Sequence, residues 1–139
     1  MLSQASGYAV TALGFLATQG GKPLLIKEMA SACDIPPAYL SKIINTLARR
    51  RLVHTQRGIG GGVSLTCEPK DLALYAICEA LDDPILHQRC MLGTAECSDE
   101  RACPAHTFWK PHRLQTVQFL KKTSVADVAA FESKRRWHQ

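Results

Sequence analysis

Four of the five residues from 58 to 62 are glycine, a run that no regular helix or strand tolerates in its interior. Short stretches containing valine and threonine flank this run, at 52–56 and 63–66. The order of strand, glycine-rich loop and strand predicts a β-hairpin. A nucleotide-binding glycine loop is disfavoured, because the Gly-Lys-Ser/Thr ending is absent and a strand, not a helix, follows.

The residues before the hairpin have the apolar spacing of helices. A first helix is predicted at 5–16, where apolar or small residues recur every three or four positions, and the glycines at 20–21 end it. A second, short helix is predicted at 26–33. The sequence Asp34-Ile35-Pro36-Pro37 then forces a turn.

A third helix is predicted from Pro37 to about residue 50, because proline is favoured in the first helical turn. Its buried stripe is Leu40, Ile43, Ile44 and Leu47. Two short helices joined by a tight turn, the second polar and basic outside, are typical of a helix-turn-helix. The hairpin would then be a wing whose flexible tip carries Arg57 in or beside the minor groove. The candidate DNA contacts are Lys27, Pro37, Ala38, Tyr39, Ser41, Lys42, Asn45, Arg49, Arg57, Gly58, Gly60 and Gly61.

The distribution of charge supports a nucleic-acid partner. The net charge is +5, and residues 1–66 hold seven Lys/Arg against two acids, while residues 67–139 hold ten of each. A positive field confined to one half suits binding to a phosphate backbone. Ordinary solubility is an alternative that charge alone leaves open.

The second half of the chain begins and ends with helical patterns. A helix is predicted at 72–81 and a last helical region from about Phe108, with Ser124 and Asp127 capping a final short helix. The predicted fold class is mainly α with a small β-hairpin wing: a winged helix-turn-helix and a long C-terminal dimerisation helix. Its three parts are a DNA-binding domain at 1–82, a cysteine-rich loop at 83–106, and the dimerisation helix and tail at 107–139.

Four potential metal ligands lie in the loop without periodicity: Cys90, Cys97, Cys103 and His106. Thiolates bind iron-sulfur clusters and zinc, and imidazole can complete either site. Gaps of five and six residues favour an iron-sulfur cluster, 2Fe-2S or 4Fe-4S, over structural zinc, whose cysteines typically stand two to four residues apart. A surface role for His106 remains open.

The remaining cysteines have simpler interpretations. Cys33 and Cys78 lie on apolar helix faces and are expected to pack in the core, and Cys67 has no evident role. In a reducing compartment, six cysteines are more consistent with metal binding or redox chemistry than with disulfide bonds. The first eight residues lack the pattern of a signal peptide, and no stretch approaches the roughly 20 apolar residues of a membrane span. We therefore expect a cytoplasmic protein that is not in a membrane.

Several motifs along the chain resemble those of a known family. The sequence is similar to the bacterial Rrf-type winged-helix regulators, the family of IscR, NsrR and RirA. The resemblance rests on Gly7-Tyr8-Ala9-Val10, Tyr39-Leu40, the glycine-rich segment 57–62, the three loop cysteines and Thr123-Ser124-Val125-Ala126-Asp127-Val128. It implies a homodimer that binds palindromic operators, with the long C-terminal helix crossing to the partner and a cluster adjusting DNA affinity.

Three departures from the family pattern bear on the cluster and the wing. Val63 stands where an aromatic residue is common, and the first cysteine gap is one residue longer than in the IscR pattern. Gly7 occupies the position where NsrR-like members provide an acidic ligand to the partner's cluster. The resemblance then implies His106 as fourth ligand, unless a small molecule or nothing takes that place.

The function predicted is a sequence-specific DNA-binding regulator, not an enzyme, whose operator affinity follows an iron-sulfur cluster that senses nitric oxide, iron or redox state. Two alternatives stay open, and a third is disfavoured. A regulator with zinc or no metal keeps the DNA-binding half, and a metal-delivery protein would use the basic half to bind another protein. A thiol redox enzyme is disfavoured, because no Cys-x-x-Cys pair is present.

Overall fold

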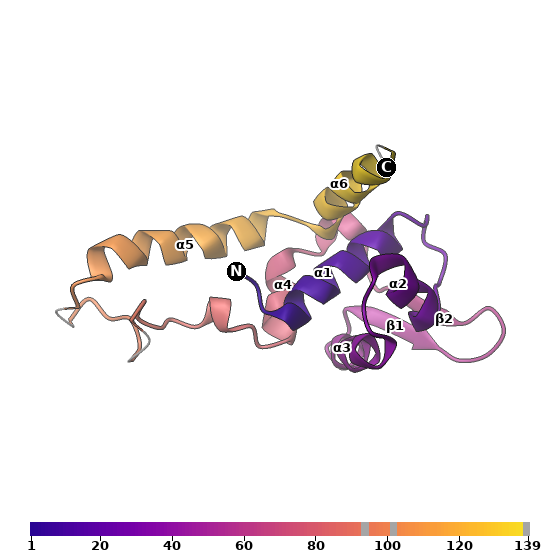
Figure 1. Ribbon diagram of the computed structural model, residues 1–139, viewed down its shortest axis with the longest axis horizontal. Helices are drawn as coiled ribbons and strands as arrows, with labels where there is room; N and C mark the ends of the chain where they lie inside the picture. The colour runs from indigo at the N-terminus through magenta and orange to yellow at the C-terminus, as the bar shows by residue number, and fades with distance from the viewer. Residues whose placement is uncertain (93–94, 101–102, 138–139) are drawn as a thin grey trace.

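The structure is a computed structural model that describes residues 1–92, 95–100 and 103–137. Helices from both halves of the chain form a body with one two-stranded sheet, and the helix α5 (His106–Lys122) extends away from it (Figure 1). This mainly helical architecture with a single hairpin confirms the predicted fold class. No helix within the described ranges is long and apolar enough to cross a membrane.

The three helices predicted before the hairpin are α1 (Gln4–Ala17), α2 (Ile26–Cys33) and α3 (Pro37–Arg49). Asp34 has a left-handed φ of 56° and ends α2, and Pro36 then caps α3. The turn is short because both prolines fix φ near the value that a helix start requires.

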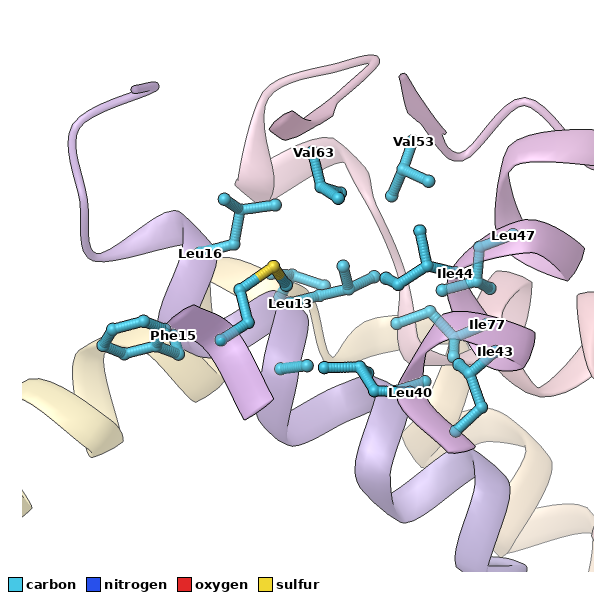
Figure 2. Packing of buried hydrophobic residues seen from close by; sticks show 14 of the residues in the cluster. Leu13, Phe15, Leu16, Leu40, Ile43, Ile44, Leu47, Val53, Val63 and Ile77 are labelled. Carbon is cyan, nitrogen blue, oxygen red and sulfur yellow. The ribbon is translucent and has the colours of Figure 1, made fainter. Parts of the chain in front are cut away.

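The body has one apolar core beneath the hairpin. The predicted stripe of α3 is buried, with Leu40 and Ile44 fully enclosed. Leu13 of α1 and side chains from both strands pack against it (Figure 2). Burial of side chains of this size contributes about 1.5–3 kcal/mol each, so the core fixes the position of α3 relative to the wing.

The wing consists of β1 (Val53–Gln56) and β2 (Gly62–Leu65), which pair antiparallel with Val53 opposite Leu65. Leu24, just before α2, pairs with β2 through an isolated antiparallel bridge. Its N–H donates to the carbonyl of Val63 at 3.0 Å. The wing is therefore joined through its backbone to the helix-turn-helix.

The helix expected at 72–81 is α4 (Leu74–Ala80), preceded by a 3-10 turn at Pro69–Asp71. It begins two residues later than predicted. The carbonyl of Leu72 accepts from the N–H of Val125 at 2.8 Å, and the N–H of Leu74 donates to the carbonyl of Thr123 at 2.9 Å. These long-range backbone bonds hold Leu72 extended, which local propensity did not reveal.

The last helix, α6 (Val125–Trp137), has the predicted cap. The hydroxyl of Ser124 accepts from the N–H of Asp127 at 3.3 Å, while the Asp127 carboxylate accepts from the N–H of Ser124 at 2.8 Å. The helix is longer than expected, at 13 residues, and packs across α1. A Cβ on Gly14 would lie 2.6 Å from Val128 Cγ1, so the close approach requires glycine there.

The loop at 83–106 leaves the body at a short 3-10 turn, Pro84–Leu86. Asp83 caps this turn and is buried, with 1% of its surface exposed. Further along, Arg89 pairs with Glu96 through an isolated bridge. The predicted last helical region begins two residues early, at His106, whose N–H donates to the carbonyl of Cys103 at 3.1 Å.

Candidate functional site

The outer surface of α3 presents most of the residues expected to contact DNA. Pro37, Ala38, Tyr39, Lys42, Asn45 and Arg49 are exposed, Ser41 is half-buried, and Lys27 is exposed on α2. Lys27, Lys42 and Arg49 form no ion pair within the described residues. Their charges are therefore not neutralised by the protein and can act on an external anion.

Tyr39 is supported from behind at the start of α3. Its ring meets the ring of Tyr8 of α1 edge to face, with centroids 5.5 Å apart and an interplanar angle of 82°. Such an arrangement is favourable for two aromatic rings and restricts the rotamers of both. The first turn of α3 is thus braced by α1.

The wing tip carries Arg57, Gly58 and Gly60 on its exposed surface, while Gly61 is half-buried. Gly58 and Gly60 have φ values of 94° and 77°, which side chains rarely permit. A Cβ on Gly61 would collide with the carbonyl of Gln56. The glycine run is therefore required by the tight turn of the tip, and Arg57 is exposed beside it.

The four candidate metal ligands form two close pairs. Cys90 Sγ lies 3.1 Å from Cys103 Sγ, and Cys97 Sγ lies 3.3 Å from His106 Nδ1. Cys90 is buried and the other three are half-buried. No three donors of the His, Cys, Asp or Glu type stand together around one metal position within the described part of the chain.

Backbone hydrogen bonds of the loop hold Cys90 and Cys97, one member of each pair. The N–H of Cys90 donates to the carbonyl of Ala95 at 2.8 Å, and the N–H of Cys97 donates to the carbonyl of Gln88 at 2.6 Å. Trp109 of α5 donates its indole N–H to the carbonyl of Arg89 at 2.9 Å. Cys90 and Cys97 thus lie on facing segments, and α5 is attached to one of them.

A charged group that sequence reasoning missed lies behind His106. Asp99 Oδ1 accepts from Lys110 Nζ at 2.7 Å and is 2.8 Å from His106 Nε2. The hydrogen bond from Lys110, followed by that from His106, lowers the pKa of Asp99 below its usual value. The available signal in the sequence was the position of Asp99, two residues after Cys97. Its partner Lys110 is eleven residues further along, on α5.

The other cysteines lie where the sequence placed them or nearby. Cys78 is fully buried, and burial, with a smaller effect of Asp83, raises the pKa of its thiol to about 11. Cys33 is half-buried at the end of α2, and Cys67 is exposed after the wing. Burial, followed by the charges of Asp71 and Glu68, raises the pKa of Cys67.

A helix-turn-helix followed by a two-stranded wing is the architecture of winged-helix DNA-binding proteins. Two solved structures share it over almost the whole chain. The CymR global cysteine regulator of B. subtilis has a TM-score of 0.78 and 24% identity, covering 94% of this chain and 97% of its own. T. potens IscR has a TM-score of 0.75 and 21% identity, covering 98% of this chain and 90% of its own.

Comparison of the sequence gives the family. Residues 2–130 match the model of the Rrf2 family, described as iron-dependent transcriptional regulators, and the chain belongs to that family. A protein of Aquifex aeolicus whose name describes an HTH-type transcriptional regulator is 30% identical over 91% of this chain and 90% of its own length. The IscR regulator of Sodalis glossinidius is 29% identical over 94% of this chain and 79% of its own. The suspected family is thereby confirmed.

Proposed function

We propose that this Rrf2-family regulator acts as a homodimer whose affinity for a pseudo-palindromic operator is set by an iron-sulfur cluster bound at Cys90, Cys97, Cys103 and His106. The observation that carries the proposal is the pairing of these four donors on a loop next to a winged helix-turn-helix. The family description, iron-dependent transcriptional regulator, agrees with it.

The DNA half of the proposal assigns a role to each exposed element. The first turn of α3, from Pro37 to Lys42, reads base edges in the major groove, while Lys27, Asn45 and Arg49 contact the flanking backbone. The wing brings Arg57 to the minor groove, and its glycines at 58, 60 and 61 allow close approach. Two such heads would bind half-sites about one helical turn apart.

The apolar side chains of α5 and α6 support a second copy of the chain as partner. Phe108, Leu114, Phe119 and Phe131 each have about half or more of their surface exposed. Three of them lie along α5 and one on α6, and large apolar side chains exposed in this way are expected to be covered in the functional assembly. The family resemblance suggests a partner's equivalent helix as that cover.

The donor set fits an iron-sulfur cluster in its chemistry and in its grouping. Three thiols and one imidazole are the soft and borderline ligands that such clusters accept. In a 2Fe-2S cluster each iron takes two protein ligands, which agrees with two separate pairs. Structural zinc sites typically have cysteines two to four residues apart, whereas the gaps here are six and five residues.

The cluster would give the loop two chemically distinct states, because its iron can change oxidation state or be lost to oxidants and nitric oxide. The chain's own contribution is to connect the loop to the body through Asp83 and to α5 through Trp109. A difference in operator affinity of a few kcal/mol between the two states is sufficient for a switch. We further propose that the protein acts in the cytoplasm, where thiols stay reduced.

Anaerobic visible spectroscopy with iron and sulfide assays tests the cluster. Wild-type protein should be brown or red with matching iron and sulfide, and Cys97→Ala should lose both. Cys67→Ala is the matched control, since that cysteine is exposed outside the loop, and it should keep the colour. Colourless protein after reconstitution would refute the cluster and favour the regulator with zinc or no metal.

Titration of operator DNA with cluster-loaded and cluster-free protein tests the regulation. The two forms should differ at least several-fold in affinity, and both should lose affinity steeply with salt, because phosphate contacts release counterions. Equal affinities would refute control by the cluster and leave DNA binding intact. No salt-sensitive DNA binding at all would instead favour the metal-delivery alternative.

A further inference from the structure

His106 lies between a thiol and a carboxylate. Its Nδ1 is 3.3 Å from Cys97 Sγ, and its Nε2 is 2.8 Å from Asp99 Oδ1. His106 is the first residue of α5, and Lys110, one turn along the same helix, donates to the same Asp99 oxygen at 2.7 Å. The imidazole is therefore held on both of its nitrogen atoms, with one of them directed at another candidate ligand.

The partner on the Nε2 side decides which nitrogen carries the hydrogen. Asp99 Oδ1 accepts from the ammonium group of Lys110 at 2.7 Å, and a carboxylate paired with a cation in this way only accepts hydrogen bonds. Nε2 must then be the donor. In the neutral ring this leaves the lone pair on Nδ1, which faces Cys97.

We propose that Asp99 is a positioning residue that orients His106 to coordinate the cluster through Nδ1, with Lys110 holding Asp99 in place. This inference rests on the proposed iron-sulfur function. A carboxylate behind a ligand histidine fixes the tautomer and the ring orientation and makes the ligand more basic. Because both His106 and Lys110 are on α5, the same contact ties the start of that helix to the ligand.

The exposure of Asp99 separates this role from a structural one. Its side chain is 70% exposed, and surface ion pairs of this kind contribute little to folding. Substitution of Asp99 should therefore leave the unfolding of the cluster-free protein unchanged while altering the cluster. Asp99→Ala should weaken cluster binding by about 10- to 100-fold, the range by which loss of such outer partners typically lowers metal affinity.

Asp99→Asn separates hydrogen bonding from charge. An asparagine carbonyl can still accept from Nε2–H, so the tautomer and most of the cluster stability should survive. Glu100→Ala is the matched control. It removes a neighbouring exposed acid that has no ion pair within the described ranges, and it should behave as wild type.

Selective isotope labelling provides the direct test. Protein containing histidine labelled with ¹⁵N at Nδ1 alone, or at Nε2 alone, is reduced and measured by pulsed electron paramagnetic resonance. Strong hyperfine coupling from the Nδ1 label, lost in His106→Ala, is expected. Strong coupling from the Nε2 label would overturn the inference while leaving the iron-sulfur function intact.

The positioning role can also be tested without iron. Long-range ¹H–¹⁵N spectra of cluster-free protein, recorded above the usual titration range of histidine, should show His106 protonated at Nε2, with that preference lost in Asp99→Ala. A ring protonated at Nδ1 would overturn the role of Asp99. Colourless wild-type protein would overturn both the cluster and Nδ1 ligation, whereas the tautomer measurement tests Asp99 in either case.

Discussion

Replacing Asp83 with alanine should destabilise the protein by about 2–4 kcal/mol. The buried carboxylate uses both oxygens: Oδ2 accepts the N–H of Ser3, and Oδ1 accepts the N–H of Ile85, each at 2.9 Å. A hydrogen bond to a charged group contributes about 1.5–3 kcal/mol, and two bonds sharing one side chain are not fully additive. Asp83→Asn keeps one acceptor and should cost about half as much.

Urea and thermal unfolding at fixed protein concentration measure this loss, since self-association would shift the transition. The Tm of Asp83→Ala should fall by roughly 5–15 °C. Asp82→Asn is the matched control, because Asp82 is exposed and its left-handed φ of 49° is tolerated by asparagine. A cost below about 0.5 kcal/mol for Asp83→Ala would refute the reasoning.

The pH dependence has a definite sign. Burial alone would raise the pKa of Asp83, but the hydrogen bonds from Ser6, Ile85 and Ser3 outweigh it and lower the pKa below its usual value. The stabilisation is therefore fully present above the unfolded pKa of about 3.9 and is lost as the pH falls through the lower folded pKa. Asp83→Asn should lack this part of the acid sensitivity.

Three further predictions concern packing, DNA and thiol reactivity. Gly14→Val should destabilise by about 1–3 kcal/mol in thermal unfolding, because a Cβ there would lie 2.6 Å from Val128 Cγ1; an unchanged Tm would contradict it. Lys42→Ala should weaken DNA binding and reduce the slope of log affinity against log salt by about 1, as measured by fluorescence anisotropy. Native protein treated with iodoacetamide at neutral pH should leave Cys78 unmodified, because it is buried with a pKa raised to about 11, whereas exposed Cys67 should react slowly; modification of Cys78 before Cys67 would count against this.

The elements that sequence reasoning predicted best are those specified by local pattern. The buried stripe of α3 repeats with helical spacing, and two prolines mark the start of that helix. A run of glycines marks the tip of the wing. The cap at Ser124 was also readable, because both partners are three residues apart. In each case the physical cause lies within a few residues of the effect.

The features that the sequence did not reveal depend on distant partners. Leu72 stays extended because its carbonyl pairs with Val125, more than fifty residues away. Asp99 accepts a hydrogen bond from Lys110 on α5, and Asp83 accepts one from Ser3, eighty residues earlier. Composition named the four candidate ligands, but only the folded loop groups them as two pairs. The roles of these ligands and of the DNA-contact residues remain predictions.

Helix α1 joins the parts of the molecule that a regulator must connect. Its cap, Ser3, is bound to Asp83 at the root of the cysteine loop, and Tyr8 meets Tyr39 at the start of α3. A helix is stiff over such a short distance, so a displacement at Asp83 that moves the N-terminal end of α1 should also move Tyr8. Because Tyr39 is held by that ring, we expect the orientation of the first turn of α3 to respond to the loop. The α3 surface proposed to contact DNA is therefore linked to the cysteine loop through direct contacts along α1.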